Sequence, residues 1–400
     1  MPRNAARPRA YLDYNASAPL RPEARTAMHA ALDLVGNPSS VHAEGRAARA
    51  VIEEARTLIA ALVGASPRGV VFTSGATEAA ALALTPSLAA AAGRDAPARL
   101  IVAGGEHPAV RLGHRFPAAA VETVKLSLDG VLDLSALERL LPEDDASTPI
   151  LALQGANNET GAIQPVAEAA RLVHRAGGLV VCDAVQLAGR EPADLKALGA
   201  DFALLSAHKL GGPKGVGALV ASQAEMLPPA LLRGGGQERS HRAGTENVAG
   251  VAGFGAAAAA ALGQAAVERE RLKRLRNAFE AELLRLAPEA VIFALGAPRL
   301  ANTSSFAIPG THASTLLIAL DLEGVAASSG AACSSGKVAP SHVLASMGVS
   351  SELAQAALRV SLGWGSGQED VSRLVAALAA ALARRQAAAT ASGPSARRTR

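Results

Sequence analysis

Short apolar runs alternate with alanine-rich, helix-forming stretches from about residue 70 onward. The runs are V-V-F-T at 70–73, L-I-V-A at 100–103, V-E-T-V at 121–124, P-I-L-A-L at 149–153, L-V-V-C at 179–182 and D-F-A-L-L at 201–205. Continuous β-branched runs of this length are typical of parallel strands that are buried on both faces. The alternation therefore predicts an α/β fold, with a mostly parallel sheet between two layers of helices. In such a fold, ligands bind where the strands end.

The C-terminal third has a different pattern. A charged amphipathic stretch at 264–286 predicts a long helix that leads out of the first domain. Beyond it, the order of elements predicts a smaller α/β unit: N-T-S-S-F-A-I, a helix from about 314, G-V-A-A-S, L-R-V-S-L and a last helix from about 368. We expect a large domain over 11–255, a small C-terminal domain over 256–386 and a disordered basic tail over 387–400.

Composition and charge exclude several function classes. Hydrophobic residues make up 50% of the chain and aromatic residues only 2%, which excludes a wholly disordered chain and disfavours an aromatic surface for stacking nucleic-acid bases. The net charge of +4 comes from arginines near the two ends, so the body of the chain is mildly acidic. We therefore expect no direct nucleic-acid partner.

The cellular setting can also be inferred from the sequence. No apolar core of a signal peptide lies near the N-terminus, and the alanine run at 253–263 is short and flanked by glycine, so we expect no membrane span. The two cysteines, Cys182 and Cys333, would make a weak disulfide framework for 400 residues. We expect a cytoplasmic protein with reduced thiols.

Three motifs at predicted strand ends carry the candidate chemistry. The first is V-F-T-S-G-A-T-E at 71–78, where a strand enters a helix through a glycine turn. Free amides at the new helix N-terminus, around Ala76 and Thr77, can seat a phosphate. Taken alone, this motif is more typical of an ordinary helix cap.

The second motif is V-V-C-D-A-V-Q at 180–186, which puts Asp183 at the end of a buried strand. A carboxylate there needs a partner to offset its desolvation, and a protonated pyridine nitrogen is such a partner. Gln186 is placed to donate to a phenolic oxygen on the same ring. Cys182 points to the other side of the strand and is expected to be an inert core thiol.

The third motif is L-L-S-A-H-K-L-G-G-P-K-G at 204–215. Lysine is scarce in this chain, and a desolvated lysine forms an imine whereas arginine does not. Lys209 is therefore the candidate imine amine, while Lys214 is expected to be a surface lysine. Ser206 and His208 are expected near the phosphate end of the same ligand.

The three motifs together specify a phosphate seat, a counter-charge for a ring nitrogen and an imine lysine. In this order they make the chain resemble the fold-type I pyridoxal-phosphate enzymes of the class V aminotransferase superfamily, and within it the cysteine desulfurases of the NifS and IscS type. The resemblance runs from Y-L-D-Y-N-A-S-A-P at 11–19 to L-R-V-S-L-G at 358–363, and includes N-N-E-T-G at 157–161 and R-A-G-T-E-N at 242–247.

The resemblance implies a sheet of the seven-stranded type in the large domain, and a role for several further residues. His107 matches the histidine that stacks on the pyridine ring and moves protons. Asn158 matches the side chain near the cofactor phenol and the substrate carboxylate, and Arg359 matches the arginine that grips that carboxylate. Thr245 matches a threonine that reaches the phosphate of the neighbouring subunit, which implies a homodimer. The implied set of pyridoxal 5'-phosphate ligands is Ala76, Thr77, His107, Asn158, Asp183, Gln186, Ser206, His208, Lys209 and Thr245.

The segment A-A-S-S-G-A-A-C-S-S-G-K-V-A-P-S-H at 326–342 surrounds Cys333 with small, flexible residues. A thiol that visits the substrate and then hands sulfur to another protein needs an accessible arm, whereas a structural cysteine has bulky apolar neighbours. Cys333 is therefore the expected sulfur acceptor, and any contact that it makes with an iron–sulfur cluster is expected to be transient and on a partner.

The expected activity is removal of sulfur from L-cysteine, with Lys209, His107 and Cys333 as the catalytic residues. The products are alanine and a Cys333 persulfide, whose sulfur passes to a scaffold or carrier protein for iron–sulfur cluster assembly or thiolation. The alternatives are a selenocysteine lyase or a class V aminotransferase on the same fold. A non-catalytic partner that kept the fold is disfavoured because Lys209, Asp183 and Cys333 are all present.

Overall fold

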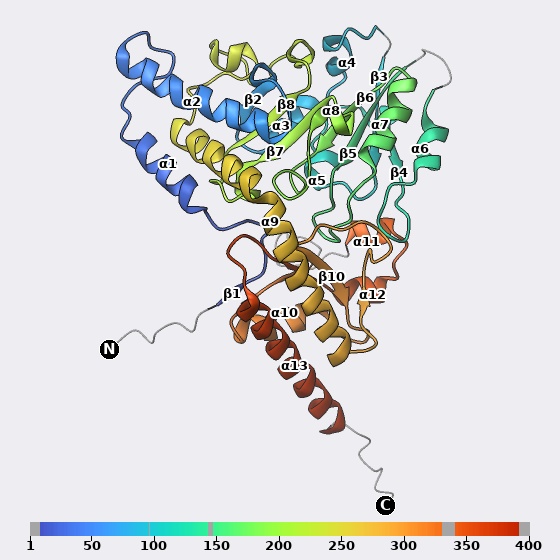
Figure 1. Ribbon diagram of the computed structural model, residues 1–400. Helices are drawn as coiled ribbons and strands as arrows, with labels where there is room; N and C mark the ends of the chain where they lie inside the picture. The colour runs from blue at the N-terminus through green and yellow to red at the C-terminus, as the bar shows by residue number, and fades with distance from the viewer. Residues whose placement is uncertain (1–8, 96, 143–146, 330–340, 392–400) are drawn as a thin grey trace, which may run out of the picture.

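The computed structural model describes residues 9–95, 97–142, 147–329 and 341–391. Over these residues the chain forms a larger and a smaller domain, and the long helix α9 (Val248–Leu286) passes from one to the other (Figure 1). Cys333 lies outside the described residues.

The larger domain is built around a seven-stranded sheet. Its strands, in spatial order, are β2 (Val70–Thr73), β8 (Gly217–Ala221), β7 (Phe202–Ser206), β6 (Leu179–Asp183), β5 (Thr148–Gln154), β3 (Ala98–Ala103) and β4 (Val121–Val124). All six predicted strands are confirmed, and β3 to β7 pair in parallel. The unpredicted strand β8 runs antiparallel to β7 and β2. It follows β7 after a short Gly-rich connection, which cannot make the crossover that a parallel pair needs.

Alternate residues of the central strands pack into two separate cores. On β6, Val180 and Cys182 face the core that includes α2, α7 and α9, whereas Val181 faces the core that includes α3 and α4. Helices therefore cover both faces of the sheet, as the sequence predicted. The helices of this domain are α1 (Pro22–Leu32), α2 (Ala43–Leu62), α3 (Ala76–Ala83), α4 (Ser87–Ala91), α5 (Pro108–Arg111), α6 (Leu134–Leu140), α7 (Val166–Arg175) and α8 (Leu195–Leu198).

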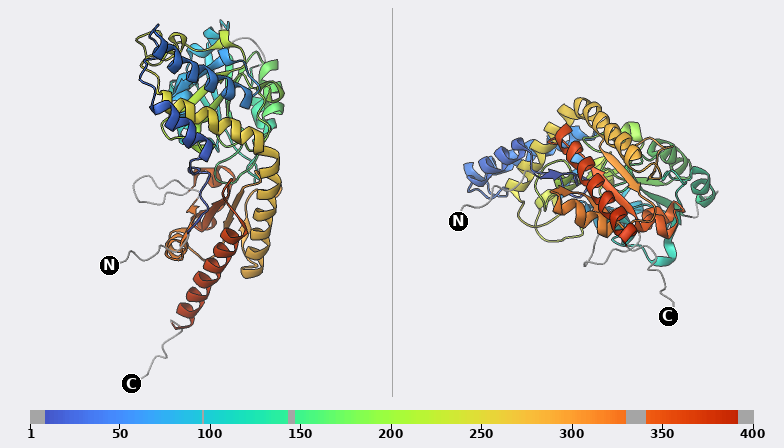
Figure 2. Two further views of the ribbon diagram at one scale, coloured as in Figure 1. Left: turned by 60° about the vertical axis from the view of Figure 1, so that its left-hand side comes forward. Right: turned by 90° about the horizontal axis from the view of Figure 1, so that it is seen from below.

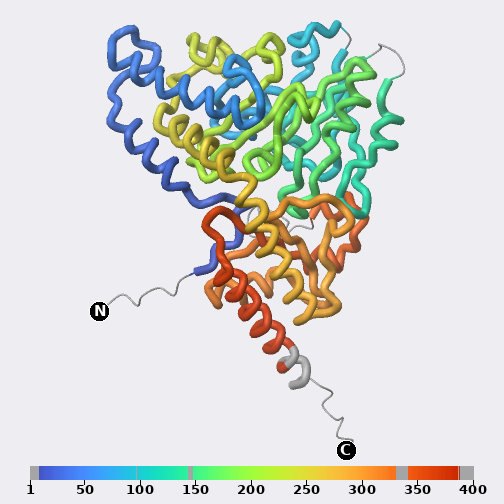
Figure 3. The backbone as a smooth tube through the Cα atoms, viewed as in Figure 1, coloured from blue at the N-terminus to red at the C-terminus, as the bar shows by residue number. Residues whose placement is uncertain are grey.

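The smaller domain has a four-stranded antiparallel sheet in the order β12-β13-β10-β9. Its elements are β9 (Val291–Ile292), β10 (Thr303–Ala307), α10 (Ala313–Leu322), β11 (Val325–Ala326), β12 (Ser328–Ser329), α11 (His342–Ser346), α12 (Ser351–Gln355), β13 (Ala357–Ser361) and α13 (Gln368–Ala391). The N-terminal strand β1 (Ala10–Tyr11) pairs in parallel with β11, so the start of the described chain belongs to this domain. Helix α13 continues past residue 386, where the basic tail was expected to begin. The first and last described stretches of the chain, β1 and α13, both belong to this side of the molecule (Figure 3).

Helix α9 is longer than the predicted 264–286 and contains the expected domain boundary at 255 and 256. It runs along both domains, as the side view shows (Figure 2). Its first half is apolar and long enough to cross a membrane by composition, but half of that window is buried within the protein. Phe254 and Ala257 are fully buried in the core of the larger domain, while Phe279 and Leu283 lie in that of the smaller one. The apolar side chains of α9 are therefore accounted for by packing in the cores of the two domains.

Candidate active site

A cavity of about 730 Å³ lies where β5, β6 and β7 end. This is the position at which parallel α/β sheets bind ligands. Predicted site residues that line it are Ala76, Thr77, His107, Asn158, Asp183, Gln186, Ser206, His208, Lys209 and Arg359. The structure thus brings into one space side chains that are spread over nearly 300 residues of sequence.

One end of the cavity is an anion seat formed by the turn from β2 into α3. Ser74, Gly75, Ala76 and Thr77 all line the cavity there. The backbone amides in the first turn of α3 lack partners within the helix and carry its positive dipole end. A Cβ on Gly217 of the neighbouring β8 would lie 2.6 Å from Gly75 Cα, so β8 needs a glycine to let this turn sit close.

Ser206 and His208 adjoin the anion seat from the end of β7. Burial and the charges of Lys209 and Lys214 lower the pKa of His208 to about 4. His208 is therefore neutral near pH 7, and its Nδ1 lies 3.3 Å from Ser17 Oγ. Lys214 is exposed, as predicted, and lies at the cavity wall.

Asp183 occupies the last position of β6, in register with Gln154 of β5. Desolvation raises the pKa of its carboxyl to about 6, against the lowering effects of a hydrogen bond from Val185 N and the charge of Lys209. The Val185 amide donates to Asp183 Oδ1 at 3.0 Å. The charged form of a desolvated carboxylate is stabilised when a cationic group enters the cavity beside it.

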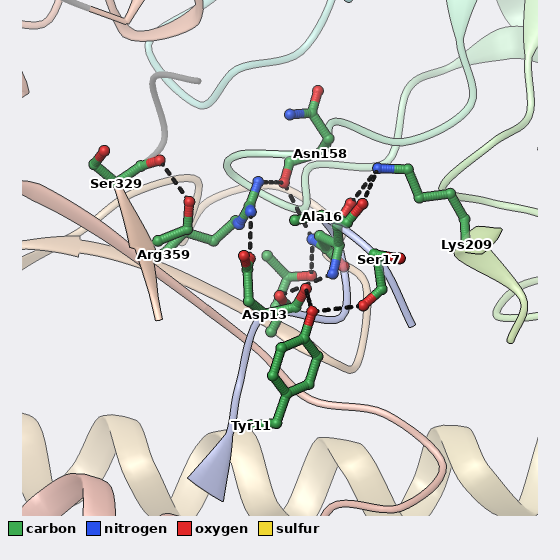
Figure 4. A network of polar contacts seen from close by, with 12 residues as sticks. Tyr11, Asp13, Ala16, Ser17, Asn158, Lys209, Ser329 and Arg359 are labelled. Carbon is green, nitrogen blue, oxygen red and sulfur yellow. Dashed lines mark hydrogen bonds and ion pairs between the residues drawn. The ribbon is translucent and has the colours of Figure 1, made fainter. Parts of the chain in front are cut away.

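Lys209 extends into the cavity from the short turn that follows β7, and its amine is held by the N-terminal loop (Figure 4). Nζ donates to the carbonyl oxygens of Asn15 at 2.6 Å and Ala16 at 2.9 Å. Burial, then the charges of Arg359 and Arg190, lower the pKa of Lys209 to about 8. With this pKa about one-tenth of the amines are neutral at pH 7, far more than for a lysine of ordinary pKa, and the neutral form is the one that forms an imine.

Arg359 lies on β13 and reaches the cavity from the smaller domain, as Ser328 and Ser329 of β12 also do. Its guanidinium donates to the Asn158 carbonyl at 2.9 Å and pairs with Asp13 at 2.6 Å (Figure 4). The Asn158 side chain points away from this contact (Figure 4), and Asn158 also lines the cavity. The two residues that were assigned to the substrate carboxylate are therefore neighbours in space.

His107 caps the N-terminus of α5, where its Nδ1 accepts from Ala109 N at 3.1 Å. The ring borders the cavity, and desolvation there, with the charge of Lys209, lowers its pKa. Glu106, the preceding residue, is fully buried and accepts from Gln154 N at 2.7 Å. Burial and the nearby Asp183 carboxylate raise the pKa of Glu106 well above its usual range.

Asn15 is a structural centre of the site that the sequence reasoning missed. Its carbonyl accepts from Gln186 Nε2 at 3.0 Å as well as from Lys209. Its side chain donates to the Asn158 carbonyl at 3.1 Å and accepts from Arg190 at 3.0 Å. The motif at 11–19 was noticed as part of the resemblance, but nothing local predicts that this loop reaches the ends of β6 and β7.

Arg190 was also missed, because A-G-R-E at 188–191 carries no motif. Its guanidinium donates to Gln186 Oε1, which turns the Gln186 amide nitrogen toward Asn15. Desolvation, with the nearby charge of Arg359, lowers the pKa of Arg190 to about 10.

Three predicted residues lie outside this constellation or outside the described chain. Cys182 is fully buried on the opposite face of β6, and desolvation raises its thiol pKa far above the usual value, which confirms the prediction of an inert thiol. Thr245 is exposed and is not among the residues that line the cavity. Cys333 lies outside the described residues, although Ser328 and Ser329, which precede its segment, border the cavity.

Comparisons with known proteins agree with this arrangement. The family model described as aminotransferase class V matches residues 10–374. A cysteine desulfurase of Cereibacter sphaeroides is 40% identical over 92% of this chain and 95% of its own. An IscS-like cysteine desulfurase of Mycobacterium tuberculosis is 38% identical over 96% of this chain and all of its own length.

Similarity to solved structures extends to the whole fold. A NifS-like protein from Rickettsia africae superposes with a TM-score of 0.84 at 32% identity, over 94% of this chain and 99% of that one. Identity and coverage at this level on both chains, together with the cavity described above, establish the family. The chain belongs to the class V aminotransferase family and, within it, to the cysteine desulfurases.

Proposed function

We propose that this cysteine desulfurase binds pyridoxal 5'-phosphate in the cavity at the ends of β5 to β7, and uses Cys333 to accept sulfur from L-cysteine. The observation that carries the proposal is the convergence of Lys209, Asp183 and the α3 anion seat on one space, with Arg359 at its edge. Lys209 suits the aldehyde of the cofactor, Asp183 its ring nitrogen and the α3 anion seat its phosphate. Arg359 suits the carboxylate of the substrate.

The described residues fit a phosphorylated pyridine better than a phosphate ester alone. A phosphate needs only the α3 amides with Ser206 and His208. It would leave unexplained a desolvated Asp183 with a raised pKa and a lysine with a lowered one in the same cavity. When bound, pyridoxal phosphate supplies the electron sink that lets a proton leave the substrate Cα.

Each residue then has a defined task. Asp183 would hold the proton on the ring nitrogen, and Gln186 would donate to the phenolic oxygen through its amide nitrogen. His107, at the N-terminus of α5, would lie against the ring. Arg359, oriented by Asp13 and the Asn158 carbonyl, binds the substrate carboxylate. Lys209, released as a free amine, accepts the Cα proton.

Sulfur transfer requires a second nucleophile. The Cys333 thiolate attacks the substrate sulfur, so that a sulfur–sulfur bond forms as the bond from substrate Cβ to sulfur breaks. Alanine leaves after Cβ and Cα have each gained a proton. Cys333 then carries the persulfide and passes it to an acceptor protein, for iron–sulfur cluster assembly or another thiolation, and it touches any cluster only transiently.

The proposal extends to assembly and location. The resemblance that assigns Thr245 to a neighbouring site implies a homodimer, and the exposed position of Thr245 is compatible with this role. The cytoplasm is the proposed location, because the thiol chemistry of Cys333 needs reducing conditions. A selenocysteine lyase or an aminotransferase on the same fold is the alternative, and neither requires Cys333 in the same way.

The test separates cofactor chemistry from sulfur transfer. We expect Cys333→Ala to keep the bound cofactor and to show the wild-type absorbance change when cysteine is added. Alanine release should fall by about 100-fold or more, because the covalent nucleophile is lost. Mass spectrometry of wild type incubated with cysteine should find one reducible extra sulfur on Cys333.

Cys182→Ala is the matched control, since Cys182 lies on the other face of the sheet, and it should keep full activity. Borohydride should fix the cofactor to Lys209, because it reduces an imine to a stable amine. Wild-type rates of alanine release from Cys333→Ala, or sulfur that maps to Cys182, would refute the desulfurase mechanism in favour of the alternatives.

A further inference from the structure

Arg190 approaches the active site from outside the cavity that would hold the cofactor. Among the described residues, Gln186 and Asn15 line only the active-site cavity, whereas Arg190 lines only a smaller cavity of about 40 Å³. Lys209 lies between the two and lines both. Arg190 is therefore placed to act on Lys209 and Gln186 without touching a ligand in the active-site cavity.

The turn after β6 that carries Gln186 and Arg190 is closely packed. Gly189, directly before Arg190, has a φ of +73°, a conformation that favours glycine. A Cβ there would lie 2.8 Å from Leu210 Cδ2 and 2.9 Å from Ala261 Cβ of α9. The position from which the Arg190 side chain extends is therefore set by the packing of this turn against the lysine turn and α9.

The two ends of the Gln186 amide have different partners, and the chemistry of the partners fixes which end is which. Arg190 has only donors, so it faces Gln186 Oε1, and its Nη1 also donates to Asn15 Oδ1 at 3.0 Å. The Asn15 carbonyl only accepts, so it faces Gln186 Nε2, at 3.0 Å. The same carbonyl accepts from Lys209 Nζ at 2.6 Å. The amide nitrogen of Gln186 therefore lies on the Lys209 side, and the amide oxygen on the Arg190 side.

Arg190 also brings a positive charge close to Lys209. Its guanidinium donates to neutral oxygens, including the Lys209 carbonyl at 3.4 Å. Within the described parts of the chain no carboxylate forms an ion pair with Arg190, and the carboxylate of nearby Glu268 pairs with Arg21 at 3.0 Å. A cation without an ion-pair partner disfavours a second positive charge on the Lys209 amine.

Other charged groups act on the same amine. Burial lowers the pKa of Lys209 most, followed by the charges of Arg359 and Arg190, whereas Asp183 and Asp13 raise it. On the proposed function, Arg359 would meet the substrate carboxylate and Asp183 the ring nitrogen, so ligands would offset both of these charges. Arg190 does not line the active-site cavity, so its charge would act on Lys209 whether or not a ligand is bound.

We propose that Arg190 is a positioning residue that presents the Gln186 amide nitrogen to the phenolic oxygen of the bound cofactor and, through its charge, keeps the Lys209 amine reactive. The inference deepens the proposed function and rests on it. Arg190 touches neither substrate nor cofactor. Without it, the Gln186 amide would be free to present its oxygen to the phenolic oxygen, and the Lys209 amine would hold its proton more tightly.

The first measurement needs no cofactor. In protein stripped of pyridoxal phosphate, the rate of reductive methylation of Lys209 at pH 7 reports the fraction of the amine that is neutral. Arg190→Met replaces the guanidinium with an apolar side chain, so the rate should fall by about threefold or more. Arg190→Lys keeps the charge and should react like wild type.

Arg269→Met is the matched control for this measurement. Arg269 lines the same smaller cavity as Arg190, but its guanidinium pairs with Glu191 at 3.0 Å. Its charge is therefore already offset, and its removal should leave the methylation rate of Lys209 unchanged.

The second measurement follows the absorbance of the bound cofactor in holoenzyme over a pH series. The imine nitrogen shares its proton with the phenolic oxygen, so a donor to that oxygen stabilises the form that has lost the proton. Wild type should therefore titrate at a lower pH than Arg190→Met. In a Gln186→Leu background, Arg190→Met should shift the titration at most about half as far, because the effect that passes through the amide is absent.

Four results would overturn the inference. They are an unchanged methylation rate in Arg190→Met, an unchanged holoenzyme titration, equal effects of Arg190→Met and Arg269→Met, or an undiminished effect of Arg190→Met in the Gln186→Leu background. If Arg190→Met does not fold, Arg190→Gln, which is neutral and too short to reach Gln186, decides the question. Failure of the proposed function is distinct, because borohydride would then fix no cofactor to Lys209 of wild type, while methylation of cofactor-free protein would still report on Arg190.

Discussion

The chemistry of single residues in this protein depends on where burial leaves them. Lys209 and Asp183 share one cavity, and desolvation moves their pKa values in opposite directions, to about 8 for the amine and about 6 for the carboxyl. Both shifts favour the uncharged form, the neutral amine of Lys209 and the neutral acid of Asp183, when no ligand is bound. Cys182, next to Asp183 in sequence, faces the opposite core, and burial makes it unreactive.

The lowered pKa of Lys209 predicts its reactivity in protein stripped of cofactor. Below about pH 8 the amine is protonated, and above it the neutral nucleophile predominates, so reductive methylation of Lys209 should rise through a midpoint near 8. Peptide mass spectrometry over a pH series measures this midpoint.

Asp183→Asn is the informative comparison for that titration. The Asp183 charge raises the pKa of Lys209, so its removal should shift the midpoint downward. A midpoint at the ordinary lysine value of 10.5 in both proteins would contradict the assigned environment.

At the scale of elements, buried ion pairs fix the loops on which the site depends. Arg56 of α2 makes two hydrogen bonds of 2.8 Å to Glu238, and Glu238 also accepts from Phe72 N of β2. Glu238, Arg239 and Ser240 all have positive φ, which is unfavourable for residues with side chains. The pair therefore holds a strained turn in the loop that leads to Thr245.

Removal of Glu238 should be costly. Glu238→Ala removes the buried carboxylate from Arg56, which keeps only exposed Glu53 as an ion-pair partner, and it should lower the free energy of unfolding by about 3 kcal/mol or more. Urea denaturation measures the loss. Glu53→Ala is the control, because Glu53 pairs with the same arginine but is exposed, and it should cost less than about 1 kcal/mol. Equal costs would show that the buried pair has no special role.

At the scale of the whole molecule, one described chain holds a cavity but leaves apolar side chains uncovered. Val35 and Val41, in the connection between α1 and α2, are 90% and 88% exposed. Thr245 is exposed as well and does not line the cavity of its own chain. These features are compatible with the proposed homodimer, in which each chain completes the site of the other.

Mixed dimers test this arrangement. Lys209→Ala and Thr245→Ala homodimers should each be impaired. In a mixed dimer, one site receives both defects, while the other combines intact Lys209 with intact Thr245 of the partner subunit. Activity should therefore recover to about half of wild type per dimer on the shared-site geometry. If Thr245 acts within its own chain, the mixed dimer will show no recovery.

How far the sequence predicts the site depends on how local each signal is. Lys209, Asp183 and the α3 turn each follow an apolar strand directly, and a strand's end is visible in its own residues. Asn15 and Arg190 carry no such signal, because the contacts that tie them to each other and Asn15 to Lys209 are distant in sequence. Strand β8 was missed for a related reason: its five residues follow a Gly-rich turn too closely for the alternating pattern to stand out.

The sequence by itself determined the α/β class, six of the seven strands in the large sheet and the identity of the chemical groups, since strand periodicity and reactive side chains are local properties. Only the tertiary structure decided which groups meet. The N-terminal loop closes the cavity under Lys209, β1 joins the smaller domain, and Glu159 binds Ser341 across 182 positions of sequence. Such contacts arise from how two domains pack, and packing between distant segments leaves no pattern within either segment.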